Sequence, residues 1–227
     1  MTPSILDNPV WSALQGPHRH LAVVSGNTRW YPSDLAPFIA VPSSTVIPEL
    51  DRALAQGWSG QAFFVGVCPT TLPAGWRYIS LSQILQLLPP LSSDSSAEDF
   101  GTVLGMTDQP QMLDLAQAAF PDFFRNRTPE LGLYLGVYER ARLVAMAGER
   151  MSLPGFQEIS GVCTHPEFTG RGYASRLTSS LLRRHRLRGV QSFLHVSEGN
   201  LAARRIYDAM GFTIRASLLL GKIERLA

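Results

Sequence analysis

Hydrophobic and polar positions divide the chain into two parts, of which the second has the clearer pattern. From residue 102 onward, apolar runs of strand length alternate with segments that carry apolar residues at helical spacing. The pattern predicts strands at 102–106, 131–138, 142–148, 157–164 and 190–196, helices at 172–187 and 200–210, and a final hairpin at 212–223. Thr107 and Asp108 cap one more predicted helix, whose apolar positions run from 112 to 119. The predicted order of elements is therefore β-α-β-β-β-α-β-α-β-β.

The first part of the chain has shorter apolar runs, at 21–24, 38–41 and 62–67, separated by proline and glycine. A helix is predicted at 44–56, so this part is expected to form a small α/β unit. Residues 88–97 concentrate proline and serine without any apolar period, which is typical of a linker or a long loop. We therefore predict an N-terminal unit at 1–98 and a second domain at 99–227.

Composition indicates a globular protein without an unusual charge. The 227 residues include 20 basic and 18 acidic side chains, and hydrophobic residues make up 45% of the chain. A net charge of +2 does not favour nucleic-acid binding. Glycine and proline interrupt the long uncharged run between Arg52 and Arg77, so no membrane span is predicted. The N-terminus shows no secretory signal. The chain has only two cysteines, Cys68 and Cys163, so no disulfide framework is expected. We therefore expect a cytoplasmic protein.

A glycine-containing turn between a strand and a helix is the first candidate binding feature. The predicted strand at 157–164 is followed by His165-Pro166 and then by Gly170-Arg171-Gly172 at the start of a helix. Glycines let the backbone approach an anion, and a helix N-terminus adds free N–H groups and about half a positive charge. This favours a phosphate or pyrophosphate ligand, although a plain structural turn would look the same. The motifs of nucleotide kinases and of dinucleotide-binding reductases are absent.

A second motif lies one strand further on, at 200–212, with the sequence NLAARRIYDAMGF. With both motifs in this order, residues 102–225 resemble the GCN5-related N-acetyltransferase (GNAT) superfamily, and the end of the chain is similar to its FR47-like branch. The resemblance implies an α/β (α+β) fold whose mixed, mostly antiparallel central sheet is splayed between its fourth and fifth strands and flanked by helices. It also implies that acetyl-CoA lies in this opening. The N-terminal unit could be a degenerate half of the same fold, or a module for acceptor binding or dimerisation.

The resemblance assigns cofactor-binding roles to two groups of residues. The pyrophosphate loop of the family maps onto Thr169, Gly170, Arg171, Gly172, Tyr173 and Ala174. Thr169 departs from the family pattern, which has Gln or Arg there. The main chain of Val162 and Thr164 would bind the pantetheine arm, and Asn200 would reach the cofactor from the start of its helix.

Two further residues are candidates for catalysis. Tyr207 matches the position beside the thioester sulfur, where a phenol can donate to the departing thiolate; the alternative is a core aromatic residue. Glu158 is the candidate general base for the acceptor amine, and the alternative is an exposed carboxylate at a strand end. Plain alternation puts residues 158, 160, 162 and 164 on one face, unless the bulge known in this family intervenes. His195 is interpreted as a satisfied core histidine and Cys163 as a packed thiol.

The implied function is transfer of the acetyl group of acetyl-CoA to a primary amine of a small molecule, amino acid or peptide, by direct attack in a ternary complex. A catalytically degenerate sensor that binds acyl-CoA is the alternative. The segment 120–127 would contribute to the acceptor pocket, where Arg125 and Arg127 would favour an acidic acceptor. No metal, nucleic acid or membrane is expected to take part, and a homodimer remains open.

Overall fold

The computed structural model describes residues 4–58, 61–90, 99–119 and 123–226, which form two sheets. The smaller sheet has the order β1-β2-β3, with strands Val23–Ser25, Thr28–Trp30 and Ile39–Ala40. The larger sheet has the order β4-β11-β5-β10-β9-β8-β7-β6. Its strands are β4 (Ala62–Gly66), β11 (Thr213–Arg225), β5 (Trp76–Leu88), β10 (Gln191–Ser197), β9 (Phe156–Thr164), β8 (Arg142–Leu153), β7 (Tyr134–Glu139) and β6 (Thr102–Val103).

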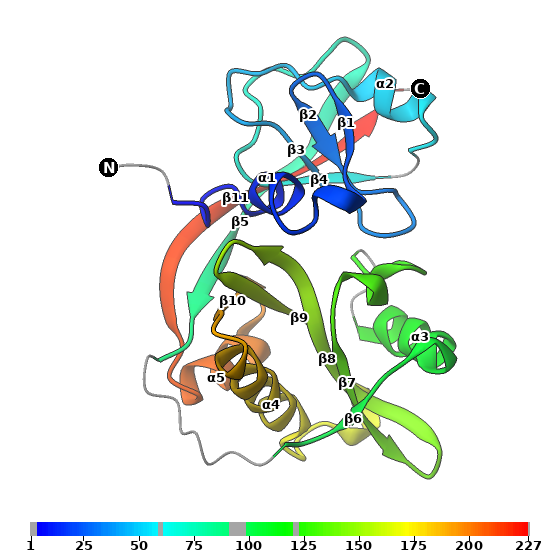
Figure 1. Ribbon diagram of the computed structural model, residues 1–227, viewed down its shortest axis with the longest axis vertical. Coiled ribbons are helices and arrows are strands. Elements are labelled where there is room, and N and C mark those ends of the chain that lie inside the picture. Colours follow the sequence, from blue (N-terminus) through cyan, green and yellow to red (C-terminus); the bar gives the residue numbers. More distant parts are fainter. Residues whose placement is uncertain (1–3, 59–60, 91–98, 120–122, 227) are drawn as a thin grey trace.

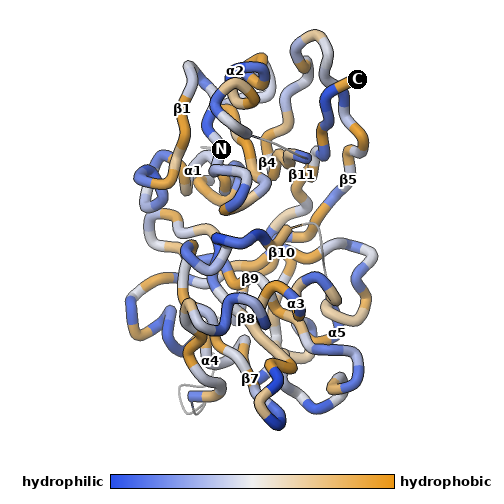
Figure 2. The backbone as a smooth tube through the Cα atoms, turned by 90° about the vertical axis from the view of Figure 1, so that its right-hand side faces the viewer, coloured by the Kyte–Doolittle hydropathy of each residue, from blue (hydrophilic) through white to orange (hydrophobic). Residues whose placement is uncertain are grey.

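Helices cover both faces of the larger sheet. They are α1 (Pro9–Gln15), α2 (Leu50–Ala55), α3 (Gln109–Ala119), α4 (Tyr173–Leu187) and α5 (Leu201–Ala209). α4 and α5 pack on one face, where Leu177 and Leu181 meet Ile159 and Leu194. α1 and α3 pack on the other face (Figure 1). Hydrophobic stretches concentrate along the strands between these layers, and hydrophilic stretches lie in the outer loops (Figure 2).

The strand pairs of the larger sheet are antiparallel, apart from the parallel pair β9 and β10. This confirms the predicted fold class, a mixed and mostly antiparallel sheet flanked by helices. The strands and helices predicted between 131 and 210 are present, with ends shifted by a few residues. A turn at 139–141 joins β7 to β8, with positive φ angles at Arg140 and Ala141.

Three predicted elements differ in the structure. The predicted hairpin at 212–223 is wrong, because β11 runs unbroken from Thr213 to Arg225 and pairs with β5 on one edge and β4 on the other. The helix predicted at 44–56 is reduced to α2, and the strand predicted at 102–106 is reduced to β6. β5 was not predicted at all.

The larger sheet includes strands from both sides of the predicted boundary near residue 98. β4 and β5 precede that position, whereas β10 and β11 follow it. The long strands β5 and β11 run from the lower part of the molecule into the upper part, beside β1 to β4 and α2 (Figure 1). The division at residue 98 therefore stays a prediction, and residues 91–98 lie outside the described part of the chain.

None of the helices in the described ranges is both long enough and apolar enough to cross a membrane.

Candidate active site

An opening between β9 and β10 forms the centre of the candidate site. The two strands pair in parallel from Phe156 and Gln191 to Ile159 and Leu194, and there the pairing ends. Within the described part of the chain, residues 160–164 of β9 pair with β8 alone, while the end of β10 pairs with β5. These are the fourth and fifth strands of the predicted second domain, so the splay is where it was expected. Among the described residues, no strand pairs with this backbone edge of β9 beyond Ile159.

A bulge in β9 changes which side chains share a face. The register with β8 shifts between Met146 and Gly148, opposite Gly161, whose φ is +62°. Val162 therefore packs with the cluster under α4, on the same side as Ile159. The neighbouring Cys163 packs against α3. Glu158, which precedes Ile159, faces the opposite side from Val162, so plain alternation does not describe this strand.

The predicted pyrophosphate loop lies at the N-terminus of α4. Gly170 and Gly172 have φ angles of +76° and +73°, in the left-handed region that glycine adopts without strain. A Cβ atom added at Gly170 would meet no atom within 4 Å. The backbone N–H groups of residues 170–175 donate to no other residue in the described ranges. An unused row of donors at a helix N-terminus suits an anionic group such as a pyrophosphate.

Side chains around this loop hold its conformation. The Thr169 hydroxyl donates to the carbonyl of Pro166 at 3.0 Å, so it stabilises its own turn. Arg171 stacks on Phe168 at 4.8 Å and lies 3.7 Å from a carboxylate oxygen of Glu139. The Tyr173 hydroxyl donates to the same carboxylate at 2.5 Å. Ala174 follows in the first turn of α4.

Tyr207 and Asn200 lie on and next to α5. The ring of Tyr207 is buried and packs against Phe212, with 5.5 Å between ring centroids. No hydrogen bond to its hydroxyl is found within the described residues, and burial raises the pKa of the phenol to about 12. The Asn200 side chain caps α5, because its oxygen accepts from the backbone N–H of Ala203 at 3.1 Å. The predicted contact of Asn200 with the cofactor stays a prediction.

Glu158 is fully buried, so the alternative of an exposed carboxylate is wrong. It accepts from two nitrogens of Arg150 at 2.6 and 2.9 Å, from the backbone N–H of Met151 at 3.2 Å and from His195 Nδ1 at 2.8 Å. Burial by itself raises the pKa of this carboxyl, but Arg150 and His195 outweigh it and hold the pKa at about 2. A carboxylate this acidic, with both oxygens engaged, is poorly suited to accept a proton near neutral pH. The geometry therefore opposes the predicted role of general base.

Two interpretations of buried residues are confirmed. The side chain of His195 is buried and hydrogen-bonded on both ring nitrogens, as expected for a satisfied core histidine. Cys163 is a buried free thiol whose pKa is raised to about 12 by burial.

The predicted acceptor segment is only partly described, because residues 120–122 lie outside the described ranges. Arg127 is paired with Glu130 at 2.7 Å and with Asp34 at 3.5 Å, so local carboxylates already engage its charge.

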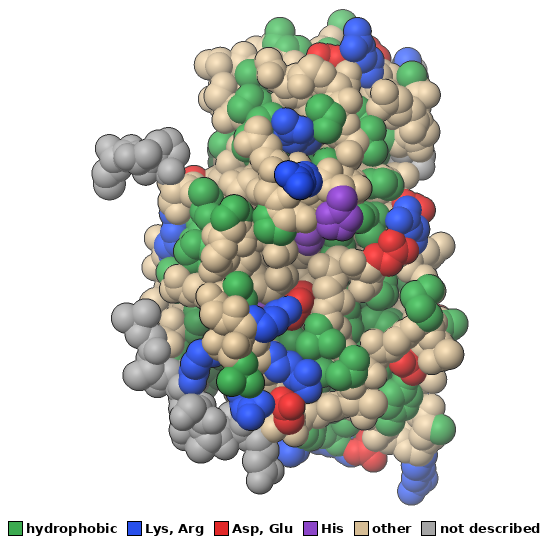
Figure 3. Space-filling model, in the orientation of Figure 1, with side chains coloured by type: hydrophobic (Ala, Val, Ile, Leu, Met, Phe, Trp, Pro, Cys, Tyr) green, Lys and Arg blue, Asp and Glu red, His purple; other side chains and the backbone are tan. Residues whose placement is uncertain are grey.

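On the face shown in Figure 3, Lys and Arg side chains gather over α4, below histidine side chains at the middle of the molecule. Arg183 and Arg184 of α4 pair with Asp99.

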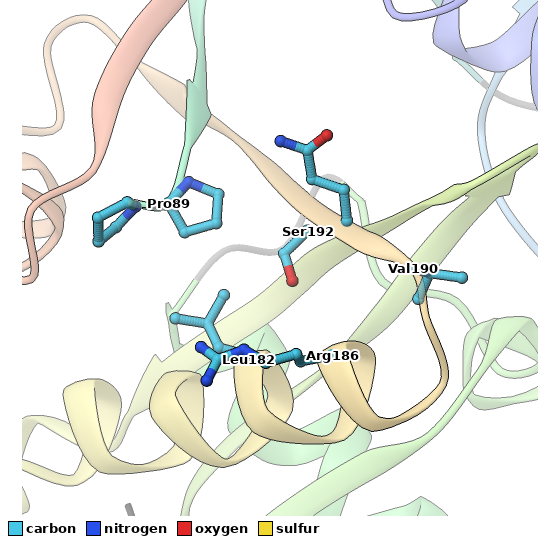
Figure 4. Close-up of a pocket in the computed structure, with 7 residues that line it drawn as sticks. Pro89, Leu182, Arg186, Val190 and Ser192 are labelled. Carbon is cyan, nitrogen blue, oxygen red and sulfur yellow. The ribbon is translucent and has the colours of Figure 1, made fainter. Parts of the chain in front are cut away.

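A separate pocket of about 210 Å³ lies near the C-terminal end of α4 and the start of β10 (Figure 4). It is lined by Pro89, Pro90, Leu182, Arg186, Val190, Gln191 and Ser192. The predicted pyrophosphate loop lies at the opposite end of α4, so this pocket is not part of the candidate site.

Sequence reasoning missed three residues around Glu158 and His195. Arg150 contacts Glu158, Gln86 contacts His195, and Arg215 contacts Gln86. They lie on three different strands. Nothing in the local pattern around each residue marks it as a partner of the others, because the order of strands in the sheet brings them together.

Comparisons with known proteins agree with this geometry. The family model described as "FR47-like protein" matches residues 134–219. A structure from Novosphingobium aromaticivorans, described as an acetyltransferase of the GNAT family, is 35% identical with a TM-score of 0.86, and the match covers 99% of this chain and 100% of that one. No curated protein gives a significant match.

Two more distant structures share the fold. A GCN5-related N-acetyltransferase from Kribbella flavida is 17% identical with a TM-score of 0.60, over 96% of this chain and 94% of that one. A GCN5-related N-acetyltransferase-like protein from Streptococcus suis is 13% identical with a TM-score of 0.61, over 95% and 94%. Because the match to the Novosphingobium structure covers nearly the whole of both chains at 35% identity, the chain belongs to the GNAT family of acetyltransferases.

Proposed function

We propose that this protein is an N-acetyltransferase, which transfers the acetyl group of acetyl-CoA to a primary amine of a small molecule, amino acid or peptide. The observation that carries the proposal is the row of unused N–H donors at residues 170–175, which follows directly on the strand with the open edge. Together they provide an anion site and an extended backbone edge for one long ligand. Bound acetyl-CoA supplies an activated acetyl group as a thioester.

The chain's own groups would hold this ligand at two places. The N–H groups from Gly170 to Ser175 would bind the pyrophosphate, helped by the partial positive charge of the N-terminus of α4. The free backbone edge of β9, at Val162 and Thr164, would bind the pantetheine arm as an added strand would. Both contacts use the main chain, so they depend on backbone conformation more than on side-chain identity.

Tyr207 is suited to act as a hydrogen-bond donor to the leaving thiolate. Its pKa of about 12 keeps the phenol protonated at neutral pH. An ordinary thiol has a pKa of about 8.5, so complete proton transfer from this phenol to a thiolate would be uphill. The hydroxyl would therefore stabilise the thiolate through a hydrogen bond, and water would supply the proton afterwards.

The position of Glu158 gives weight to a second candidate function. If its carboxylate cannot serve as a base, the acceptor amine must lose its proton to solvent or to another group before it attacks. A sensor that binds acyl-CoA without turnover has no such requirement. The second candidate is therefore a CoA-binding regulatory protein with the same fold.

A transfer assay against a panel of amines separates the two functions. We expect at least one amine, incubated with the protein and acetyl-CoA, to yield an acetylated product by mass spectrometry. Calorimetric titration of acetyl-CoA accompanies the assay. Binding without any acetylated product across amino acids, peptides and polyamines would favour the sensor, and the absence of binding would contradict both functions.

A further inference from the structure

Five polar side chains form a continuous row across one face of the larger sheet, at the level where β9 and β10 separate. We call this the cross-sheet row; it consists of Arg150, Glu158, His195, Gln86 and Arg215. Glu158 accepts from Arg150 and from His195, the other nitrogen of His195 lies 3.0 Å from Gln86, and Arg215 donates to Gln86 at 2.7 Å. Arg215 also pairs with Asp7 at 2.6 Å. The row thus links five neighbouring strands, β8, β9, β10, β5 and β11.

Strand register and two bulges produce this alignment. His195 is directly opposite Gln86 in the antiparallel pair β10–β5. Arg150 falls in the register shift between Glu149 and Ser152 of β8. Arg215 falls in the register shift between Ile214 and Ala216 of β11. A bulge redirects a side chain relative to its neighbours, and here each bulge supplies an arginine at one end of the row.

Arg215, at one end of the row, determines the direction of the hydrogen bonds that lead to Glu158. Arginine only donates, so the Gln86 atom facing Arg215 is the carbonyl oxygen and the other amide atom is the NH₂ group. That NH₂ donates to the carbonyl of Leu6 and to His195 Nε2. His195 therefore accepts at Nε2 and carries its proton on Nδ1, which donates to Glu158. The imidazole is thus hydrogen-bonded through both ring nitrogens.

The row lies where the backbone ladder between β9 and β10 ends. The last backbone pair is Ile159 with Leu194, so His195 is the first residue of β10 beyond the paired segment. The Glu158–His195 hydrogen bond crosses from the paired part of β9 to this first separated residue. On its other side, His195 is held by Gln86 of β5. Side chains thus fix the relative position of β9 and β10 at the origin of the opening.

We propose that Glu158 and His195 are positioning residues that set the opening between β9 and β10 in which acetyl-CoA binds; this inference rests on the proposed function. Arg150 and Gln86 hold the pair in place. Glu158 acts here through His195 and the strand backbone, so it neither touches the acceptor nor takes its proton. Loosening the pair should weaken binding of the CoA moiety, because the edge of β9 would no longer be held at a fixed distance from β10.

The chain contains a matched control pair. His185 and Glu149 form a second buried His–Glu contact, at 3.1 Å, between α4 and β8. Its histidine also has a second hydrogen bond, to Ser192 at 2.7 Å. This pair does not link β9 to β10. Disrupting either pair should destabilise the fold, but only disruption of Glu158–His195 should alter the opening.

The experiment compares the dissociation constant of CoA, measured by calorimetry, for the wild type, His195→Phe and His185→Phe. We expect about a tenfold weaker affinity for His195→Phe and less than a threefold change for His185→Phe. His195→Asn keeps a donor near the Nδ1 position and should restore most of the affinity. If His195→Phe does not fold, His195→Asn is compared with Glu158→Gln instead. We then expect the weaker CoA affinity in Glu158→Gln, because this variant leaves the charge of Arg150 unpaired.

Three results would overturn the inference. The first is a His195→Phe variant that binds CoA as tightly as the wild type. If His195→Phe does not fold, the same result in Glu158→Gln counts instead. Another is an equal loss of affinity in the His195 and His185 variants. The third is a Glu158→Gln variant that keeps its CoA affinity but loses turnover, as removal of a base would do. If the wild type itself binds no CoA, the proposed function fails, and that outcome is distinct from all three.

Discussion

At the scale of single residues, the surroundings of Glu158 decide its chemistry. The side chain is fully buried and has an arginine and a histidine as partners. A buried ion pair adds little net stability compared with a well-packed apolar pair, but losing one partner leaves an uncompensated charge. The chain therefore depends on this carboxylate for stability, whatever its part in the reaction.

The variant Glu158→Gln should lose about 3–5 kcal/mol in the free energy of unfolding at pH 7, because Arg150 then keeps an unpaired buried charge. The pKa of Glu158 in the folded protein, about 2, is below its value of about 4.3 in an unfolded chain. The ionised group therefore stabilises the fold above that unfolded value, and its contribution is lost as the pH falls toward 2. Urea denaturation of both proteins between pH 7 and pH 3 should show the difference shrinking.

A difference that stays constant over this pH range would contradict the assigned ionisation of Glu158. The matched control is Glu130→Gln, which removes an exposed partner of Arg127. It should change the free energy of unfolding by less than about 1 kcal/mol at pH 7.

Removing the hydroxyl of Tyr207 should slow turnover without weakening donor binding. We expect Tyr207→Phe to lower kcat by about tenfold to a hundredfold, at the low end of general acid–base effects, because the phenol stabilises the thiolate without fully transferring its proton. The dissociation constant for acetyl-CoA should stay within about twofold. Tyr78→Phe, whose hydroxyl donates to Pro69 in the N-terminal part, is the control and should keep the wild-type kcat. Equal kcat values for the two variants would exclude Tyr207 from the reaction.

At the scale of elements, the first turn of α4 is the proposed binding site for the pyrophosphate, and the same helix provides its own control. Gly172 lies before the N-terminus of α4 with φ +73°, and Gly189 lies after its C-terminus with φ +71°. A side chain at either position meets open space or a single flexible atom, so the backbone strain of a substitution should be similar. The two positions differ in the helix end that they occupy.

Gly172→Glu should abolish CoA binding, because it places a carboxylate beside the N–H groups that would bind the pyrophosphate. Gly189→Glu should leave the affinity for CoA within about twofold of the wild type, although it carries the same charge and similar strain. Calorimetric titration of CoA into both variants measures the difference. Equal affinities in the two variants would refute the assignment of the pyrophosphate loop.

How well each element could be predicted depends on how local its signal is. The glycine turn and α4 are contiguous in the sequence, so the turn at 170–172 and the helix that follows it could be predicted. β5 was not predicted, because its apolar and polar residues alternate only from Ile79 to Ser82, and residues 77–83 are mostly exposed. The bulges at Gly161, Arg150 and Arg215 arise from pairing between strands, and plain alternation could not locate them.

At the scale of the whole molecule, the larger sheet connects the N-terminal part to the site. β5 lies between β10 and β11, and β4 covers the far edge of β11. Leu85 and Leu87 of β5 belong to the same buried cluster as Leu177 of α4 and Tyr207 of α5. The cross-sheet row depends on this strand order, which is why its members, from Gln86 to Arg215, could not be grouped from the sequence alone.

A chain that begins at residue 99 should therefore fail to fold by itself. It would lack β4 and β5, which removes both neighbours of β11 and leaves the edge of β10 that pairs with β5 without a partner. We expect no cooperative thermal unfolding transition by circular dichroism, in contrast to the full chain. A fragment that unfolds cooperatively and binds CoA would instead support the predicted boundary near residue 98.

The central claim is that the opening between β9 and β10 and the first turn of α4 serve acetyl transfer to an amine. The most direct test follows thiol release from acetyl-CoA in the presence and absence of an amine acceptor, with the acetylated amine quantified in the same samples. The account predicts that thiol release requires the amine, that it equals the acetylated product, and that Gly172→Glu abolishes it. Thiol release at the same rate without any amine, or none with any amine although acetyl-CoA binds, would contradict the account.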